Sequence, residues 1–206
     1  ATSGEYTIEA WIRPKDLTQY GPARIAGISN GPNSRDVTLG QGFGEFQTGD
    51  KLDLRTRSTG TSTNGTPSVQ SSTGLNLSLN HVVATRNAAG TTKMWVNGVV
   101  IASGVSPGDL NWDTTMPFVL ANEVGGGRAW LGEYRLVAVY DRALTDVEIA
   151  SQYQHGPTVI APNIAPVVSA GADQTLIFPL TASLAATVSD DGRPSRAGAL
   201  TEWSKL

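Results

Sequence analysis

The sequence has no cysteine, few charged residues, only two histidines and no long apolar run. Without cysteine, disulfides, thiolate metal sites and cysteine nucleophiles are excluded. Charged residues make up 16% of the 206 residues and the net charge is -3. Such a chain offers no concentrated basic face, so nucleic acid and anionic membranes are not favoured as partners. No stretch of 18 apolar residues predicts a transmembrane helix.

Strand and turn signals fill most of the chain. Residues 5–13 alternate between apolar and polar side chains, which is typical of a half-buried strand. Residues 51–57 alternate in the same way and place Arg55 and Arg57 on the polar face. Asn97-Gly98 predicts a type I′ hairpin turn, because both residues tolerate the positive φ that this turn requires. We therefore expect an all-β, antiparallel domain.

A single helix signal closes this domain. Thr145 can cap a helix N-terminus, and Glu148, three residues on, can complete a capping box. Gly156 and Pro157 provide the stop. The segment between residues 58 and 74 is almost purely Ser, Thr, Asn and Gly, and we expect a long surface loop there that is too polar to bury.

The composition predicts two domains of unequal completeness. Residues 1–157 form the first, and the proline-rich residues 158–165 form a linker. Residues 166–206 carry further short strand signals, and about 40 residues can hold only part of a β-sandwich domain of roughly 100.

Three ordered motifs carry a family resemblance. EYTIEAWIRP (5–14), HVVATRNAAGTTKMWVNGVVIASG (81–104) and WLGEYRLVAVYDRALT (130–145) together resemble the laminin-G-like branch of the concanavalin A-like jelly rolls. The resemblance implies an antiparallel β-sandwich jelly roll with one short C-terminal helix. Where that family usually has an Asp-Glu pair, this chain has Arg135 and Leu136, which argues against a metal at that position. Residues 163–195 resemble the first half of an immunoglobulin-like repeat of the PKD or cadherin type.

Candidate ligand-binding residues follow from the chemistry of sugars. Aromatic rings pack on the apolar faces of pyranoses, and planar donors and acceptors bind vicinal hydroxyls. Core packing is the alternative for Trp130 and Trp112, and a solvated sheet face is the alternative for the arginines. The candidates are Arg55, Arg57, Trp112, Asn122, Glu123, Arg128 and Trp130.

Catalytic and metal signals are sparser. Glu5 and Glu9 are four residues apart, but no third acid joins them, and His81 and His155 belong to no Ser/His/Asp grouping. We therefore expect no enzyme activity. Calcium prefers six to eight oxygen ligands. Its candidate ligands are Asn33, Asp36 and Asp141, with the alternative that these are turn residues held by local hydrogen bonds.

These observations favour a non-catalytic carbohydrate-binding module of a secreted, multidomain bacterial protein, with a polysaccharide or glycan as its partner. The extracellular location is part of this expectation. The rival hypothesis is a structural or adhesive module that associates with itself or with other proteins. Unpaired strand edges in an incomplete second domain are templates for such pairing.

Overall fold

The computed structural model describes residues 3–19, 21–43 and 49–157, together with 167–169, 171–173, 175, 177, 181 and 187–189 of the C-terminal part. The chain divides into two compact units, Ala1–Thr158 and Val159–Leu206. The expected linker at 158–165 lies outside the described residues.

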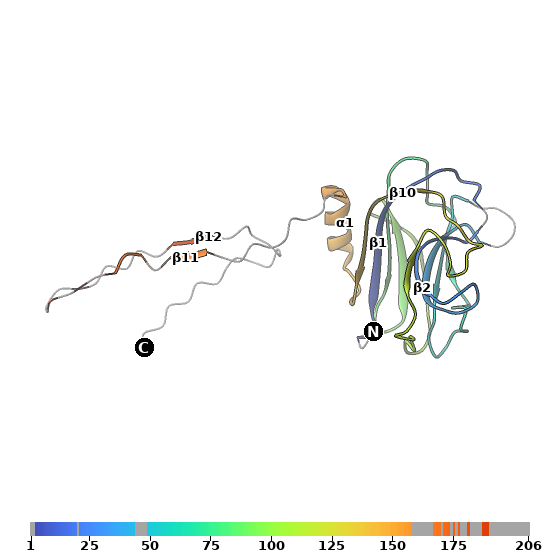
Figure 1. The fold of residues 1–206 in the computed structure, drawn as a ribbon, viewed down its shortest axis with the longest axis horizontal. Helices are drawn as coiled ribbons and strands as arrows, with labels where there is room; N and C mark the ends of the chain where they lie inside the picture. The colour runs from blue at the N-terminus through green and yellow to red at the C-terminus, as the bar shows by residue number, and fades with distance from the viewer. Residues whose placement is uncertain are drawn as a thin grey trace. The chain divides into compact units, whose positions relative to one another are not determined.

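Two five-stranded antiparallel sheets make up the first unit (Figure 1). The first sheet has the order β10-β1-β6-β7-β8, and the second has the order β5-β4-β3-β2-β9. The prediction of an all-β, antiparallel jelly roll is confirmed. The strands are β1 (Tyr6–Pro14), β2 (Ala23–Ser29), β3 (Arg35–Gln41), β4 (Leu52–Thr56), β5 (Val69–Gln70), β6 (Asn80–Arg86), β7 (Thr91–Val96), β8 (Val99–Val105), β9 (Phe118–Leu120) and β10 (Gly132–Tyr140).

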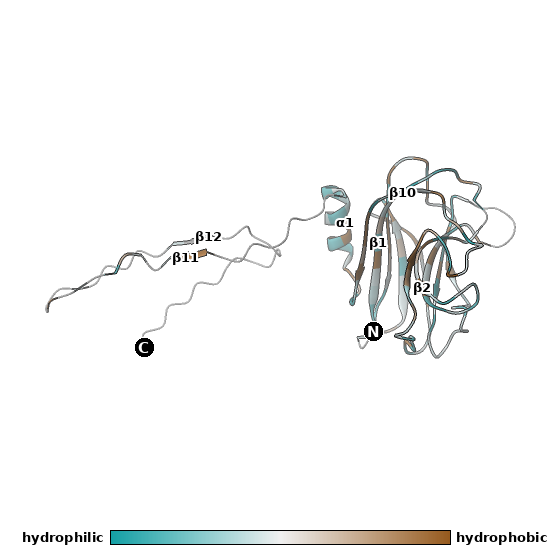
Figure 2. Cartoon of the chain, viewed as in Figure 1, coloured by the Kyte–Doolittle hydropathy of each residue, from teal (hydrophilic) through white to brown (hydrophobic). Residues whose placement is uncertain are grey.

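Side-chain alternation along the strands creates the core between the sheets. Tyr6, Ile8, Ala10 and Ile12 of β1 all point into it and are almost completely buried. The hydrophobic, brown stretches of Figure 2 lie mainly on strands, whereas the connecting segments are mostly hydrophilic. Asn97 and Gly98 have φ values of 53° and 77°, as the predicted hairpin turn requires.

The single helix, α1 (Asp146–His155), begins and ends as predicted. Thr145 and Glu148 form a complete capping box, and the Gly156 N–H donates to the Gln152 carbonyl. Ile149 of α1 packs with Val83 and Trp95 in a second, smaller core. The helix therefore covers the face of the first sheet that points away from the main core, beside β1 in Figure 1.

Aromatic and charged side chains of β1, β6 and β10 lie beneath this helix. The rings of Trp11 and His81 stack with centroids 4.6 Å apart, and Tyr153 of α1 stacks 6.1 Å from His81. His81 Nε2 lies 3.0 Å from Glu9 Oε1, and Tyr140 donates a hydrogen bond of 2.7 Å to the other Glu9 oxygen. Glu9 is thus part of a buried network, inaccessible to a substrate.

One sequence expectation was wrong. The polar segment 58–74 contains the short strand β5, which pairs with β4. Ser58 and Ser71 are buried, and Ser71 accepts a hydrogen bond of 2.8 Å from the Leu52 N–H. Hydroxyl groups that satisfy backbone donors allow so polar a segment to pack against the sandwich.

Only scattered residues of the second unit are described. β11 (Val167–Ser169) and β12 (Thr187–Ser189) pair antiparallel. No helix among the described residues is both long and apolar enough to cross a membrane.

Candidate functional site

A hollow at the start of β1 brings together one predicted sugar-binding residue and one predicted metal ligand. We call it the Trp112 pocket. Its volume is about 260 Å³. It is lined by Glu5, Tyr6, Trp112, Val139, Tyr140 and Asp141.

The Trp112 ring forms the aromatic wall of this pocket. It is partly buried and packs on Tyr6, with ring centroids 5.3 Å apart and an angle of 39° between the planes. Its Nε1 is shielded from solvent and has no hydrogen-bond partner among the described residues. Because this N–H is shielded, Trp112 offers a ligand its flat apolar surface and not its donor.

Two carboxylates border the same pocket, and they differ in whether they accept hydrogen bonds from the protein. Glu5 accepts hydrogen bonds from the backbone N–H groups of Ala88 (3.0 Å) and Ala143 (3.3 Å), which fixes its position. Asp141 is exposed, and its carboxylate accepts no hydrogen bond from a described residue. Asp141 is therefore the acceptor in this pocket that remains available to a ligand.

The loop from Asn122 to Arg128 holds three of the predicted sugar-binding residues, and each of them makes contacts that stabilise the loop. Asn122 Oδ1 closes the loop by accepting from the N–H groups of Glu123 (2.8 Å) and Arg128 (3.0 Å). The Arg128 guanidinium donates to the Gly21 carbonyl at 3.1 Å. The φ values of Gly125, Gly126 and Gly127 are 86°, 86° and 88°, a conformation that only glycine adopts without strain.

Glu123 anchors this loop to the second sheet. Its side chain is fully buried and forms ion pairs with Arg24 and, at 3.1 Å, with Arg35. Ser29 donates to its second oxygen at 2.7 Å. Glu123 therefore holds the loop in place rather than facing a ligand.

The two arginines that bind Glu123 were not singled out from the sequence. Burial lowers the pKa of Arg24, and burial together with the nearby Arg24 lowers the pKa of Arg35 to about 10. Arg24 Nη1 and Arg35 Nε are buried and have no hydrogen-bond partner among the described residues. No sequence signal connects these arginines to Glu123, because 88 and 99 residues separate them along the chain.

Arg55 and Arg57 lie on the outer side of β4 and beyond its end, each close to an acid. Arg55 donates to Asp53 (2.7 Å) and to Asn64 (3.0 Å). Arg57 lies 3.9 Å from Asp36. Their side chains are only 17% and 22% exposed, so they present little surface to a ligand.

Trp130 is core. It is 2% exposed, and its Nε1 donates to Gln41 Oε1 at 2.7 Å. Its ring also meets Tyr134 edge-on at 4.8 Å. Core packing, the alternative to sugar binding given above for Trp130, therefore describes this residue, because no face of the ring is open to a glycan.

The predicted calcium ligands do not form a recognisable site. Asp36 accepts from the Asp113 N–H at 2.9 Å, and burial raises the pKa of its carboxyl group. Asn33 is exposed in a turn, and Asp141 lies at the Trp112 pocket. Across the part of the chain that the structure describes, no three Asp, Glu or His side chains gather as metal ligands would. Calcium binding stays a prediction.

Comparison with known proteins identifies the family to which this fold belongs. The model of the concanavalin A-like lectin/glucanase superfamily matches residues 1–150. The chain belongs to this family. It therefore has a lectin-like β-sandwich, as the three sequence motifs predicted. No curated protein sequence matches the chain.

Several solved structures share the fold at low sequence identity. A Bacteroides ovatus protein to which carbohydrate binding has been ascribed is 20% identical, with a TM-score of 0.57 over 73% of this chain and 41% of that one. A heptameric SAP-like pentraxin from Limulus polyphemus is 15% identical, with a TM-score of 0.51 over 72% and 69%. Domain 4 of an extracellular GH43 arabinanase from Geobacillus stearothermophilus, in complex with arabinotriose, is 18% identical, with a TM-score of 0.50 over 72% and 66%.

Proposed function

We propose that residues 1–157 form a non-catalytic carbohydrate-binding module of a secreted, multidomain bacterial protein, and that the Trp112 pocket holds a sugar ring. The observation that carries this proposal is the placement of Trp112. Its partly exposed ring stands in a hollow beside the Asp141 carboxylate.

The chemistry of the pocket suits a neutral sugar. The apolar face of a pyranose packs on an indole ring, while a carboxylate accepts hydrogen bonds from its hydroxyls. Val139, which is 47% exposed, extends the apolar surface next to Trp112. A volume of about 260 Å³ is below that of most drug-sized ligand sites, so we expect one ring to be bound and the affinity to be weak. Tandem modules would then raise the overall affinity through avidity.

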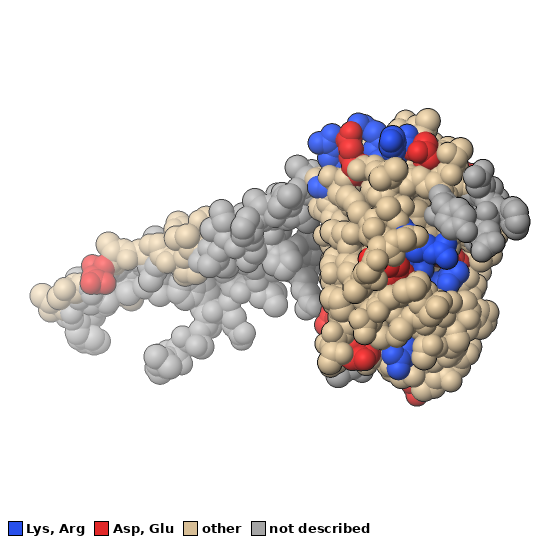
Figure 3. Space-filling model, turned by 45° about the vertical axis from the view of Figure 1, so that its right-hand side comes forward, with Lys and Arg blue, Asp and Glu red and all other residues tan. Residues whose placement is uncertain are grey.

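The face of the molecule drawn in Figure 3 has large areas that suit uncharged ligands. On the face drawn in Figure 3, charged side chains form small groups on a surface that is otherwise uncharged. The fold neighbours described above as carbohydrate-binding, or as bound to arabinotriose, support a sugar ligand by analogy of fold. The chain covers 41% of the first of them, so the activity of the whole parent protein belongs to the proposal.

A glycan array read with and without calcium tests the proposal. We expect Trp112→Ala to weaken binding to the selected glycan about tenfold or more, which corresponds to about 1.4 kcal/mol, and Trp112→Phe to weaken it less. Asp141→Asn keeps the shape of the pocket and should weaken binding several-fold. Phe118→Ala is the matched control, because Phe118 is 46% exposed and does not line the pocket.

Thermal unfolding of each variant separates loss of binding from loss of folding, since Trp112 also packs on Tyr6. If folded Trp112→Ala binds as the wild type does, the pocket is not the sugar site. Loss of binding on addition of EDTA would instead support the calcium prediction.

The rival function, self-association through the C-terminal segment, has its own observation. Val167 and Val168 of β11 are 63% and 67% exposed, and exposed apolar side chains on short strands favour association. Light scattering of the whole chain tests it. A monomer at all concentrations would remove this second candidate.

A further inference from the structure

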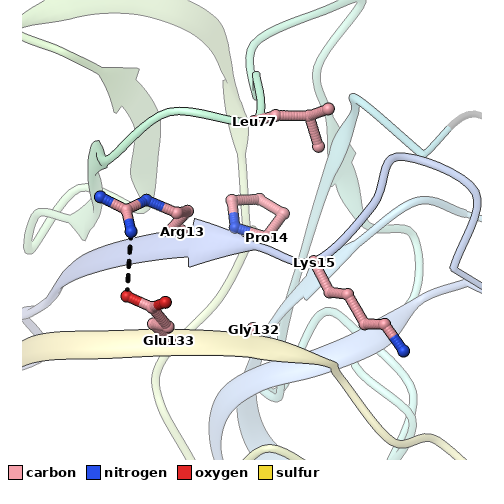
Figure 4. Close-up of a pocket in the computed structure, with 6 residues that line it drawn as sticks. All are labelled: Arg13, Pro14, Lys15, Leu77, Gly132 and Glu133. Atoms are coloured by element: carbon pink, nitrogen blue, oxygen red, sulfur yellow. Dashed lines mark hydrogen bonds and ion pairs between the residues drawn. The ribbon is translucent and has the colours of Figure 1, made fainter.

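A second pocket lies at the other end of β1. We call it the Arg13 pocket, and its volume is about 410 Å³ (Figure 4). Tyr6 of the Trp112 pocket and Pro14 of this one are eight strand steps apart, about 26 Å at 3.3 Å per residue. It is lined by Arg13, Pro14, Lys15, Leu77, Gly132 and Glu133.

This pocket has an excess of positive charge. Arg13 and Arg135 both lie 3.2 Å from the same oxygen of Glu133, so one carboxylate is shared by two guanidinium groups. The Lys15 ammonium has no ion-pair partner among the described residues. The neighbouring acid, Asp16, directs its carboxylate to the N–H and hydroxyl of Thr18. Among the residues that line the pocket, Arg13 and Lys15 are the two cations and Glu133 is the one anion, and Arg135 lies against that anion from outside the lining. The lining thus carries one net positive charge, in a chain whose net charge is -3.

The ion pairs in this pocket are exchangeable. The side chains of Arg13, Glu133 and Arg135 are 43%, 53% and 54% exposed. Exposed pairs of this kind contribute about 0–1 kcal/mol, so a second carboxylate can compete with Glu133 for a guanidinium. Figure 4 shows Arg13 beside Glu133, with Lys15 extending from the other side of Pro14.

The pocket also has a rigid floor and an apolar side. A Cβ at Gly132 would come within 2.3 Å of the Trp130 ring and 2.4 Å of the Arg13 carbonyl, so the floor is backbone lying directly on a buried tryptophan. Leu77, 57% exposed, faces Pro14 across the pocket, and Leu131, 48% exposed, precedes Gly132. An apolar surface flanked by cations suits a ring that carries an acidic group.

We propose that the Arg13 pocket binds the anionic group of an acidic saccharide, a uronate carboxylate or a sulfate ester. A guanidinium binds such planar or tetrahedral oxyanions through two N–H groups, and the Lys15 ammonium adds a point charge. The anion replaces Glu133 on Arg13, while the Leu77 side packs on the sugar ring. The proposal relies on the proposed function only for the saccharide nature of the ligand.

Titration calorimetry with three probes at low and moderate salt tests this inference. The probes are an oligogalacturonate, the same oligomer with its carboxyl groups methyl-esterified, and a sulfated oligosaccharide of equal length. We expect the acidic probes to bind and the esterified one not to bind. Preference between the two acidic probes identifies which oxyanion is the ligand.

Two changes in the pocket should shift affinity in opposite directions. The double variant Arg13→Gln/Lys15→Gln should weaken binding of the acidic probe at least tenfold. Glu133→Gln should strengthen it about threefold or more, because it removes the internal competitor. The matched controls are Lys93→Gln and Asp146→Asn, which alter one exposed ion pair elsewhere with the same change of charge per substitution; each should change affinity less than twofold.

Several results would overturn the inference. The first is that the esterified probe binds as tightly as the acidic one, and the second is that Glu133→Gln binds the acidic probe more weakly than the wild type does. The third is that Lys93→Gln lowers the logarithm of the affinity by at least half as much as the double variant does. Trp112→Ala distinguishes the two sites, because it should leave binding of the acidic probe at the Arg13 pocket unchanged. If that variant loses the neutral glycan alone, the proposed function stands whatever happens at the Arg13 pocket.

Discussion

The molecule contains two Arg–Glu–Arg groups of the same composition and opposite burial. Glu123 bridges Arg24 and Arg35, whose side chains are 2% and 0% exposed. Glu133 bridges Arg13 and Arg135, whose side chains are 43% and 54% exposed. Glu123 lies 99 and 88 residues from its two arginines, whereas Glu133 lies 120 residues from Arg13 but only two from Arg135. Only the first group is sealed from water.

The difference shows that burial determines whether such a group stabilises the fold or remains available to a ligand. Buried guanidinium groups that lose their carboxylate cannot recover hydration, so the Glu123 group fixes the 121–128 loop against the second sheet. The depressed pKa of Arg35, about 10, reflects the same desolvation. The exposed Glu133 group is hydrated in either state, which leaves its cations available to exchange partners.

The largest expected effect comes from breaking the buried group. Glu123→Gln leaves Arg24 and Arg35 without a counter-charge, and we expect it to lower the free energy of unfolding by about 3–5 kcal/mol. Urea unfolding followed by tryptophan fluorescence measures this. Glu133→Gln is the matched control, and equal losses in both variants would contradict the role assigned to burial.

A buried carboxylate with a different partner should matter less. Glu9 binds His81 and Tyr140 beneath α1. Glu9 has no guanidinium partner, and a glutamine in its place can still accept the hydrogen bond from the Tyr140 hydroxyl, so Glu9→Gln leaves fewer buried groups unpaired. We expect a loss of about 1–3 kcal/mol in the same urea measurement. If Glu9→Gln lost more stability than Glu123→Gln, the presence of arginine partners would not determine how much a buried carboxylate contributes.

Local signals in the sequence predicted most of the sandwich. Alternation identified which face of β1 is core, Asn97-Gly98 identified a hairpin, and Thr145 with Glu148 identified the start of α1. Each of these depends on residues within a few positions of one another, so the chain itself carries the information.

The candidate site was predicted less completely, because it depends on contacts between distant strands. Trp112 and Asp141 were singled out separately and for different ligands, and the structure places both at one pocket. Trp130 has the same sequence appearance as Trp112, since each adjoins a loop, but Trp130 is core. Arg13 was treated only as the end of a strand and Lys15 was not singled out, although Glu133, 120 residues from Arg13, lines the same pocket as both.

A third Arg–Glu interaction, between Arg142 and Glu148, is exposed like the Glu133 group but has bidentate hydrogen bonds. Arg142 binds both oxygens of Glu148 at 2.8 Å, and the Thr145 N–H donates to the same carboxylate. These hydrogen bonds, with the one to Arg142 first, lower the pKa of Glu148 to about 2. The Glu148 side chain is 40% exposed, so solvent screening keeps its contribution below about 1 kcal/mol.

The sign of the resulting pH dependence follows from linkage. The folded pKa lies below the unfolded value of about 4.3, so the unfolded chain binds more protons between the two values. The contribution of Glu148 is therefore complete above about pH 5 and disappears as the pH falls to about 2. We expect the difference in unfolding free energy between wild type and Glu148→Gln to shrink over this window. A difference that stays constant with pH would mean that the glutamate charge does not stabilise the helix.

The smallest effect on stability should come from the exposed Glu133 group. Because all three of its side chains are hydrated, we expect Glu133→Gln to change the free energy of unfolding by less than about 0.5 kcal/mol at 0.15 M salt. That change should fall towards zero at 1 M salt, where the Debye length is about 3 Å. The loss in Glu123→Gln should depend far less on salt, because the buried group is shielded from mobile ions. Urea unfolding of both variants across this salt range measures the contrast. If the salt dependence of the two losses were the same, the Glu133 group would be as structural as the buried one, and its arginines would not be free to bind an anion.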